Sequence, residues 1–440
     1  MPNDLYSTFL LVILILLVIV IFISSIQRFE IAVLLIMLSP LLAAIFIPNN
    51  ASADADAEVG LSSYVKNGIP LLMAFVSIVK YFQLWYLHRG KIPLYLGVLS
   101  IIITFAFISA TYSLDPDITL IRSMKFLILF IFLIGFYFWI IKNGETHSFF
   151  NTLYVYALIF IAINLVAIVV LPDKVWWWVA PGRFEGVLSH PNDLGGGSAL
   201  IYPILLWKYA KLKEGESKFV VICCFVIITM FLLLSGSRTS ILLSGVAVGL
   251  WFLFGKKRVQ VLVWLMLVSI GLVILLTFTP ANLERGDQDL TTLTGRQDFW
   301  SGAITMVLEK PFTGYGFNVE GKIWEDPRFY DPKLTLWSGS SKTSLHNGYI
   351  SIAVGLGLIG LFIWVILLFL PLFKFKMKYL SNDFNAALSI MSVLFLSNFV
   401  EASIGANTFM FWLSWVVVGI YTFSKLPVKE EKKERIEYGW

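Results

Sequence analysis

Charged residues are scarce in this 440-residue sequence: Asp, Glu, Lys and Arg together make up 14% of it, whereas a soluble domain carries about a quarter. That scarcity excludes an ordinary soluble globular protein. The net charge is only +5 and is scattered along the chain, which argues against a nucleic-acid-binding protein.

Cysteine and the common catalytic motifs are also nearly absent. The two cysteines, Cys223 and Cys224, are adjacent in an apolar run. Neighbouring helical side chains point in different directions, so a disulfide between them is not expected. The sequence has no H-E-x-x-H, cysteine cluster, P-loop or G-x-S-x-G. Metal, nucleotide and serine-hydrolase chemistry therefore lack support, and we predict no metal site and no cofactor.

Long hydrophobic runs are what the sequence does have. Hydrophobic residues make up 58% of it, and the mean hydropathy is +0.81. Because only a helix satisfies its backbone groups within one such run, we predict an all-α, polytopic integral membrane protein with roughly 12–14 transmembrane helices. The expected spans are 7–26, 30–48, 67–86, 93–111, 119–141, 149–171, 196–210, 219–234, 239–254, 260–279, 347–372, 384–400 and 407–424.

The short connections alternate in charge. "LHRGKI", "GKKR" and the tail 425–440 are basic and lie on one side, whereas "SLDPD" and "EASIGAN" have no Lys or Arg. The positive-inside rule places the basic side in the cytoplasm. The predicted order is N-terminal membrane helices (1–171), an outer Arg/Gly loop (172–195), membrane helices (196–279), a large outer loop (280–346), membrane helices (347–424) and the cytoplasmic tail. The first run lacks signal-peptide features, so we interpret it as a retained span.

Arg238 lies between two apolar runs, after the small residues Ser235, Gly236 and Ser237. A guanidinium stays charged, and a charge at bilayer depth is costly. Two interpretations are open: the arginine snorkels to lipid headgroups, or it binds an anionic ligand beside the small residues.

The outer loop 172–195 supplies a second arginine, Arg183, and a glycine run, Gly195, Gly196 and Gly197, at the expected start of the next span. Glycines at a helix start let backbone N–H groups approach an anion. His190 either contacts substrate or is hydrogen-bonded locally.

The large outer loop contains an expected amphipathic helix. Thr294 and Gln297 form a capping box, and the helix should end near Pro311. Arg296 lies in its first turn, where a cation opposes the helix dipole. The apolar face is expected to comprise Phe299, Trp300, Ala303, Ile304, Val307 and Leu308.

His346 stands at the outer start of the span 347–372. A helix N-terminus disfavours an imidazolium, so a neutral imidazole that can accept a proton from an alcohol is expected there. The alternative is that His346 caps the helix or is an interfacial polar residue. Together, three arginines and one candidate base on the outer face suggest a diphosphate ligand that arrives through the lipid and is held bidentately.

In several of these segments the sequence resembles the bacterial O-antigen ligases and the related O-antigen and exopolysaccharide polymerases. The similarity rests on "GRFEGVLSHPNDLG" (182–195), "LLLSGSRTS" (232–240) and "TGRQDFW" (294–300). It also rests on His346-Asn347, nine residues, Gly357, two residues, Gly360, which fits H-[NSQ]-x9-G-x-x-[GTY].

The resemblance implies a GT-C-like helical, metal-independent glycosyltransferase of the bacterial inner membrane whose active site faces the periplasm. Its donor would be an undecaprenyl-diphosphate-linked glycan. Arg183, Arg238 and Arg296 would hold the diphosphate, and His346 would deprotonate the acceptor hydroxyl, which attacks the anomeric carbon with inversion. Residues expected to contact substrate are His190, Asn192, Gly195, Gly196, Ser235, Ser237 and Asn347.

Two acceptors fit the resemblance. A polymerase transfers glycan onto another lipid-linked repeat, in some cases with a chain-length regulator, and a ligase transfers it onto lipid A–core. We favour the polymerase slightly, because polymerases form the larger and more varied pool. A secondary transporter with a substrate site at an interrupted helix is the alternative from another class.

Overall fold

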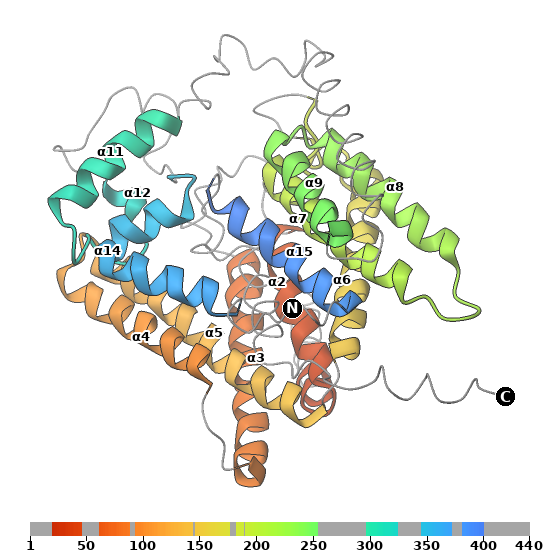
Figure 1. The fold of residues 1–440 in the computed structure, drawn as a ribbon, viewed down its shortest axis with the longest axis horizontal. Coiled ribbons are helices and arrows are strands. Elements are labelled where there is room, and N and C mark those ends of the chain that lie inside the picture. Colours follow the sequence, from red (N-terminus) through yellow and green to blue (C-terminus); the bar gives the residue numbers. More distant parts are fainter. Residues whose placement is uncertain are drawn as a thin grey trace, which may run out of the picture.

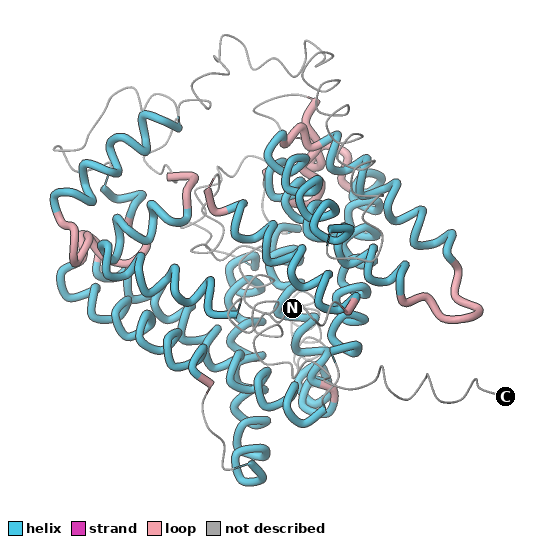
Figure 2. Tube along the Cα trace, viewed as in Figure 1, coloured by secondary structure: helices cyan, strands magenta, loops and turns pink. Residues whose placement is uncertain are grey.

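The computed structural model describes residues 20–45, 61–88, 93–143, 146–176, 182–188, 190–253, 296–323, 345–371 and 381–399. Every regular element in these ranges is a helix (Figures 1 and 2), apart from one isolated bridge between Trp176 and Phe184. The helices are α2 (Phe29–Ile45), α3 (Leu61–His88), α4 (Leu94–Ser109), η2 (Ala110–Tyr112), α5 (Pro116–Asn143), α6 (Thr146–Val170), α7 (Pro191–Ala210), α8 (Lys218–Leu234), α9 (Arg238–Leu253), α11 (Arg296–Glu309), α12 (Glu320–Ile323), α14 (Gly348–Phe369) and α15 (Asn382–Ser397).

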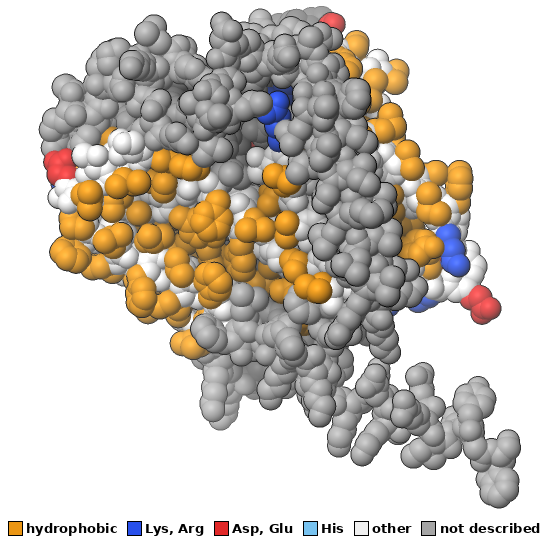
Figure 3. Space-filling model, turned by 45° about the horizontal axis from the view of Figure 1, so that its top comes forward, with side chains coloured by type: hydrophobic (Ala, Val, Ile, Leu, Met, Phe, Trp, Pro, Cys, Tyr) orange, Lys and Arg blue, Asp and Glu red, His pale blue; other side chains and the backbone are white. Residues whose placement is uncertain are grey.

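The helices confirm the prediction of an all-α, polytopic membrane protein. Among the described residues, four helical stretches are long and apolar enough to cross a membrane: Leu94–Tyr112, Pro116–Ile140, Ser148–Val170 and Gly348–Phe369. Exposed hydrophobic side chains gather in a broad zone around these helices (Figure 3). The expected spans 260–279 and 407–424, most of 7–26, and the tail 425–440 lie outside the described residues.

The helices pack in two groups. In the first helix group, α3 packs on α2 and α5, and α4 packs on α5 and α14. In the second helix group, α7 packs on α6, α8, α9 and α15. Contacts between α2 and α6 join the two groups. Helices α14 and α15 follow one another along the described chain but belong to different groups, because α14 packs on α4 and α15 packs on α7.

Small residues allow the closest helix approaches within each group. Gly135 of α5 lies against Ser77 of α3, and a Cβ at Gly135 would be 2.6 Å from the Ser77 Cβ. Gly195 of α7 lies almost as closely against Ser235 at the end of α8 and Ser240 of α9, with a Cβ 2.9 Å and 2.8 Å from their hydroxyl oxygens. Close backbone approach at small residues is the usual basis of helix packing in lipid, where burial of apolar surface gives little driving force.

Helix α14 is interrupted at Gly357. This glycine has φ 67° and ψ −175°, and a Cβ there would lie 2.4 Å from the carbonyl carbon of Phe312. Both the left-handed φ and the crowding require glycine. The second glycine of the motif, Gly360, is needed for a related reason, since a Cβ there would lie 2.2 Å from the Leu356 Cβ.

The interruption frees backbone groups, and residues 311–316 satisfy them. The carbonyls of Val354 and Gly355 accept hydrogen bonds from the amides of Tyr315 (2.9 Å) and Gly316 (3.0 Å). The amide of Leu358 donates to the Pro311 carbonyl at 2.6 Å. Irregular backbone at membrane depth is tolerated only when it is satisfied in this way.

In the segment 311–319, most of residues 314–319 are buried against the helices, whereas Phe312 and Thr313 are exposed. Its Phe317 is 1% exposed and its ring contacts Phe126 of α5 in an edge-on geometry, with centroids 5.1 Å apart. The Phe317 amide donates to the Ser109 hydroxyl (2.9 Å), and the Leu114 amide donates to the Tyr315 carbonyl (3.1 Å). The segment links α14 to the connection between α4 and α5.

Helix α11 lies beside α14 (Figure 1) and is amphipathic, but its buried face differs from the expected one. Ala303 and Met306 are buried, and Trp300 and Val307 pack against them. Ile304 and Leu308, expected on this face, are 52% and 73% exposed. The prediction is confirmed for Trp300, Ala303 and Val307 and was wrong for Ile304 and Leu308. The buried arc is centred on Ala303 and excludes these two positions, each of which lies four residues after a predicted one.

Replacing Gly357 with alanine should destabilise the protein by at least about 1–3 kcal/mol, the usual cost of a strained backbone position, plus the clash with Phe312. Gly97→Ala in α4 is the matched control, because nothing lies within 4 Å of a Cβ built there. Thermal unfolding in detergent gives the melting temperatures of both variants. Equal melting temperatures for the two variants would show that the interruption tolerates a side chain.

Candidate functional site

The connection between α6 and α7 folds back onto the end of α8 and the start of α7. The Phe184 amide donates to the Leu234 carbonyl at 2.9 Å, and the Glu185 amide donates to the Val175 carbonyl at 2.9 Å. Asn164 of α6 accepts from the Val187 amide at 3.0 Å. The connection passes so close to Asn164 that a Cβ at Gly186, where φ is +63°, would lie 1.9 Å from the Asn164 Oδ1.

This fold of the connection buries Arg183, which is only 3% exposed. Its Nε donates to the Ser235 carbonyl at the end of α8 (2.8 Å), and one terminal nitrogen donates to Asn192 Oδ1 of α7 (3.0 Å). Arg183 therefore joins the connection to two helices and places a fixed positive charge beside the turn that leads to Arg238. Asn192, expected to contact substrate, is the residue that orients this guanidinium.

His190 is the N-cap of α7. Its Nδ1 accepts a hydrogen bond from the Asn192 amide at 3.0 Å, and its carbonyl accepts from the amides of Asp193 and Leu194. Since an amide must donate, Nδ1 carries no proton. Local hydrogen bonding was one of the two expected roles of His190. The first amides of α7 are thus already bonded, so the helix start offers no ready anion site.

We predicted that the glycine run lies at the start of this helix, but it does not. Helix α7 begins at Pro191, and Gly195, Gly196 and Gly197 are buried one turn inside it. The expected boundary at 196 was wrong because His190 and Pro191 form a cap and first position that start the helix earlier. The glycines serve packing: Gly195 fits against the hydroxyls of Ser235 and Ser240.

Ser235 and Ser237 use their polar groups within the turn between α8 and α9. The Ser235 hydroxyl donates to the Leu232 carbonyl (2.7 Å), and the hydroxyls of Ser237 and Ser240 are 2.8 Å apart. We expected the small residues of this turn to leave room for a ligand, but Gly195 of α7 occupies that room. Direct substrate contact by these two hydroxyls stays a prediction that this geometry does not support.

Arg238 is the first residue of α9 and is half-buried. Neither its side chain nor the amides of Arg238, Thr239 and Ser240 hydrogen-bond to any residue that the structure describes. A cation at a helix N-terminus is electrostatically unfavourable without a ligand. The start of α9 thus has the unsatisfied first-turn amides that were expected at α7, and Arg183 is bonded to the Ser235 carbonyl of the preceding turn. Anion binding by Arg183 and Arg238 stays a prediction.

Glu185 is the main ionisable neighbour of this arrangement and was missed by sequence reasoning. It is 8% exposed, and its Oε2 bonds to no described residue. Burial raises the pKa of Glu185 to about 7, an effect that Lys174 partly offsets. The Lys174 ammonium itself donates to the last carbonyls of α2, those of Ala44 (2.6 Å) and Ile45 (2.9 Å).

At the start of α14, Asn347 and not His346 caps the helix. The Asn347 Oδ1 accepts hydrogen bonds from the amides of Tyr349 and Ile350, both at 3.0 Å. His346 is half-buried with φ 47°, a left-handed conformation uncommon for a residue other than glycine. The capping role considered for His346 thus belongs to its neighbour, and strained backbone of this kind clusters at functional sites.

Helix α11 fixes the residue that precedes His346. The Trp300 Nε1 donates to the Leu345 carbonyl at 2.9 Å, and Leu345 is buried against Ala303 and Met306. Trp300 thereby sets the backbone position of His346, a role that hydrophobic periodicity alone does not indicate. Arg296 is the first residue of α11, but its side chain lies outside the described residues.

The end of α15 joins the histidine to the second helix group. The Gly348 amide donates to the Asn398 carbonyl (2.8 Å), and Asn347 Nδ2 donates to the Phe399 carbonyl (3.1 Å). Helix α15 in turn packs on α7 and α9, and the N-terminal ends of α7 and α9 lie near Arg183 and at Arg238. The candidate residues thus fall into an arginine half (Arg183 and Arg238) on the second helix group and a histidine half (His346) on the first. That the two halves act as one site stays a prediction.

Residues 223–365 match the family model described as O-antigen ligase. The matched segment runs from α8 into α14, so it contains Arg238, α11, His346 and the interruption at Gly357. A search of curated proteins found no match to the chain.

Glu185→Gln should weaken the pH dependence of stability. The folded carboxyl keeps its proton up to a pKa of about 7, above the ordinary value of 4.5. This contribution to stability is complete below pH 4.5 and is lost as the pH rises through 7. The melting temperature of the wild type should therefore fall more between pH 5 and pH 8 than that of the variant, by a few degrees.

Glu216→Gln is the control, because Glu216 is exposed and its pKa is lowered by its hydrogen bond with Lys208. Thermal unfolding at the two pH values measures all three proteins. Equal pH slopes for the wild type and Glu185→Gln would contradict the assignment.

Proposed function

Because residues 223–365 place this chain in the O-antigen ligase/polymerase superfamily, we propose that it is a glycosyltransferase of surface polysaccharide synthesis. It moves glycan from undecaprenyl diphosphate to an acceptor hydroxyl at the periplasmic face of the bacterial inner membrane. The acceptor is another lipid-linked glycan or lipid A–core. The observation that carries the proposal is Arg238, a charged group at the start of an apolar helix that no described residue neutralises.

In this proposal the arginine half binds the diphosphate. Arg238 and the first amides of α9 supply converging donors, and helix N-termini favour phosphate. Arg183 adds fixed charge from its buried position, held by Ser235 and Asn192. A planar guanidinium matches two phosphate oxygens at once. Positive charge around the bridging oxygen also stabilises the negative charge that develops on the leaving diphosphate.

The histidine half activates the acceptor. His346 accepts the proton of the acceptor hydroxyl, and the oxygen attacks the anomeric carbon on the face opposite the diphosphate. The bond from the anomeric carbon to the diphosphate oxygen breaks as the new glycosidic bond forms, which inverts the configuration. Undecaprenyl diphosphate leaves with the electron pair. Because Asn347 caps α14, proton transfer by His346 does not require loss of the helix start.

The interrupted helix gives the transporter alternative no support. Interrupted helices in transporters use freed backbone groups to bind ions and substrates. In α14 the freed carbonyls of Val354 and Gly355 and the amide of Leu358 are already hydrogen-bonded to residues 311–316. No specific observation therefore favours transport over transfer.

Arg238→Ala should lower transfer by about 10–100-fold, the loss expected for hydrogen bonds to a charged group, with the melting temperature unchanged. Arg238→Lys should recover little of the transfer activity, because an ammonium cannot make a bidentate contact with two phosphate oxygens. Lys218→Ala is the control: Lys218 also begins an apolar helix, at the end of α8 remote from this turn. In-vitro transfer measures the three variants. Full activity in Arg238→Ala would mean that this arginine only snorkels.

His346→Asn should lose about 10²–10⁴-fold in rate, the usual contribution of general-base catalysis, and should keep its fold, since asparagine tolerates the left-handed backbone. Asn347→Ala should show the reverse, lower stability by about 0.5–2 kcal/mol through loss of the cap. The assay offers purified lipid-linked repeat and lipid A–core as separate acceptors. The acceptor that the wild type uses decides between polymerase and ligase, and near wild-type turnover by His346→Asn would rule out the base.

A further inference from the structure

His346 lies between two sets of hydrogen bonds that come from different helix groups. On one side is α11, which packs on α14 of the first helix group. On the other side is the end of α15, a helix that packs on α7 and α9 in the second helix group. His346 has φ 47°, and a residue in such a sparsely populated conformation persists only where its surroundings hold it. The bonds on both sides therefore bear on the position of the candidate base.

On the α11 side, one side chain reaches the backbone beside the histidine. The Trp300 Nε1 donates to the Leu345 carbonyl at 2.9 Å. This carbonyl and the His346 amide belong to one planar peptide unit, so the indole fixes the plane about which the His346 φ angle turns. The Trp300 ring packs against the buried Ala303 and Met306, so the position of α11 determines where this plane is held.

On the other side, the start of α14 meets the end of α15. The first amides and the last carbonyls of a helix have no partners within it. Here groups of the two ends bond to each other: the Gly348 amide donates to the Asn398 carbonyl (2.8 Å), and Asn347 Nδ2 donates to the Phe399 carbonyl (3.1 Å). The positive end of one helix dipole lies beside the negative end of the other, which stabilises this junction.

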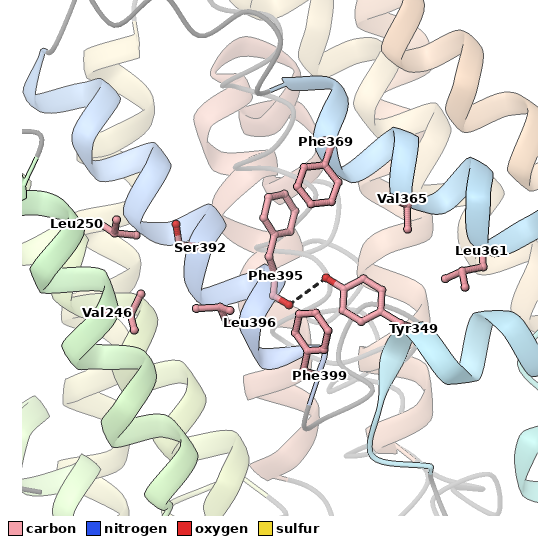
Figure 4. A pocket seen from close by; sticks show the side chains of 10 residues that line it. All are labelled: Val246, Leu250, Tyr349, Leu361, Val365, Phe369, Ser392, Phe395, Leu396 and Phe399. Carbon is pink, nitrogen blue, oxygen red and sulfur yellow. Dashed lines mark hydrogen bonds between the residues drawn. The ribbon is translucent and has the colours of Figure 1, made fainter. Parts of the chain in front are cut away.

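Tyr349 adds a side chain to the junction (Figure 4). Its hydroxyl donates to the Phe395 carbonyl in the last turn of α15 at 3.1 Å, the bond drawn in Figure 4. Its ring contacts the Phe399 ring, with centroids 4.7 Å apart. Tyr349 therefore does for α15 what Trp300 does for α11: each donates one side-chain hydrogen bond to a backbone carbonyl of another element.

The junction also relates His346 to the arginine half of the site. Helix α15 packs on α9, which begins at Arg238, so bonds between α14 and α15 restrain the histidine relative to that helix. A general base must lie within hydrogen-bond reach of the proton that it takes. A misplacement of about 1 Å can lower a rate about 100-fold. The rate of proton transfer should thus depend on the bonds that flank His346.

We propose that Trp300 and Tyr349 are positioning residues of the transfer reaction, a proposal that rests on the proposed function. Together they hold His346 from both helix groups, so that its imidazole stays within reach of the acceptor hydroxyl. Both act through the backbone of residues 345–349, and neither takes part in the chemistry. The indole N–H and the phenol O–H are the groups that matter.

Trp300→Phe should lower kcat at least about tenfold and leave KM for the lipid-linked donor near the wild-type value, because the base is displaced and donor binding is not. 3-Benzothienylalanine at position 300 should have the same effect, since it keeps the shape of the indole and replaces the N–H with sulfur. This second variant tests the bond even if Trp300→Phe folds poorly. Tyr349→Phe should also lower kcat, because only its hydroxyl is lost.

Trp207→Phe is the matched control. The Trp207 Nε1 donates to Asp383 Oδ1 at 2.6 Å, so this variant also loses one indole hydrogen bond. Asp383 lies at the start of α15, whereas the junction lies at its end. Trp207→Phe should therefore keep the wild-type kcat. Titration with radiolabelled donor gives the fraction of each purified variant that binds donor, and each kcat refers to that fraction.

A double-mutant cycle with His346→Asn separates positioning from a merely structural role. If Trp300 and Tyr349 act through His346, their Phe variants should change the residual rate of His346→Asn by less than about twofold, the scatter expected of such cycles. A structural role would lower the rate by the same factor in both backgrounds. Equal factors, coupling of only one of the two residues, or the same loss in Trp207→Phe would overturn the proposal.

The cycle also distinguishes failure of this proposal from failure of the proposed function. If the wild type transfers no glycan, or if His346→Asn turns over at the wild-type rate, the proposed function and the positioning role both fail. If His346→Asn loses activity while Trp300→Phe and the 3-benzothienylalanine variant keep the wild-type kcat, the function stands and the positioning role alone is overturned.

Discussion

The unsatisfied backbone of an interrupted helix is the constraint on which the rest of this structure depends. At Gly357 the α14 ladder breaks, and the freed groups of Val354, Gly355 and Leu358 need partners. Residues 311–316 supply them, and this segment, which directly follows α11, holds α11 against α14. Trp300 then fixes the residue before His346. Gly357, eleven residues after His346, thereby determines the position of the candidate base.

The sequence could predict the features that depend on one local segment, but not those that depend on contacts between segments far apart in the chain. Hydropathy predicted the described apolar helices, because crossing a membrane demands one long apolar run. It could not predict that α7 begins at Pro191, since that start depends on a histidine cap. The glycine run suggested an anion site, yet Gly195 is needed for contact with serines from a helix more than forty residues away. Glu185 was missed because its burial comes from the tertiary fold of the connection.

Neighbouring residues divide architectural and chemical roles in both halves of the site. Asn347 caps α14, while His346 is held in a strained conformation beside it. Arg183 is buried and bonded to two helices, while Arg238 has no described partner. In each pair, the residue with the structural bonds fixes the backbone for the other. Sequence motifs contain both kinds of residue and do not distinguish them.

The position of Arg238 also has a consequence for selectivity in a living membrane. In the proposed membrane orientation, this half-buried guanidinium would be surrounded by phospholipid phosphates, which are far more abundant than any glycan carrier. A single arginine would therefore spend its time on bulk lipid. A ligand with two linked phosphates can engage two fixed cations at once, and the second contact benefits from a high effective concentration. Under the proposed function, competition with ordinary headgroups would account for an arginine, Arg183, that is immobilised within the fold and bonded to the turn before Arg238.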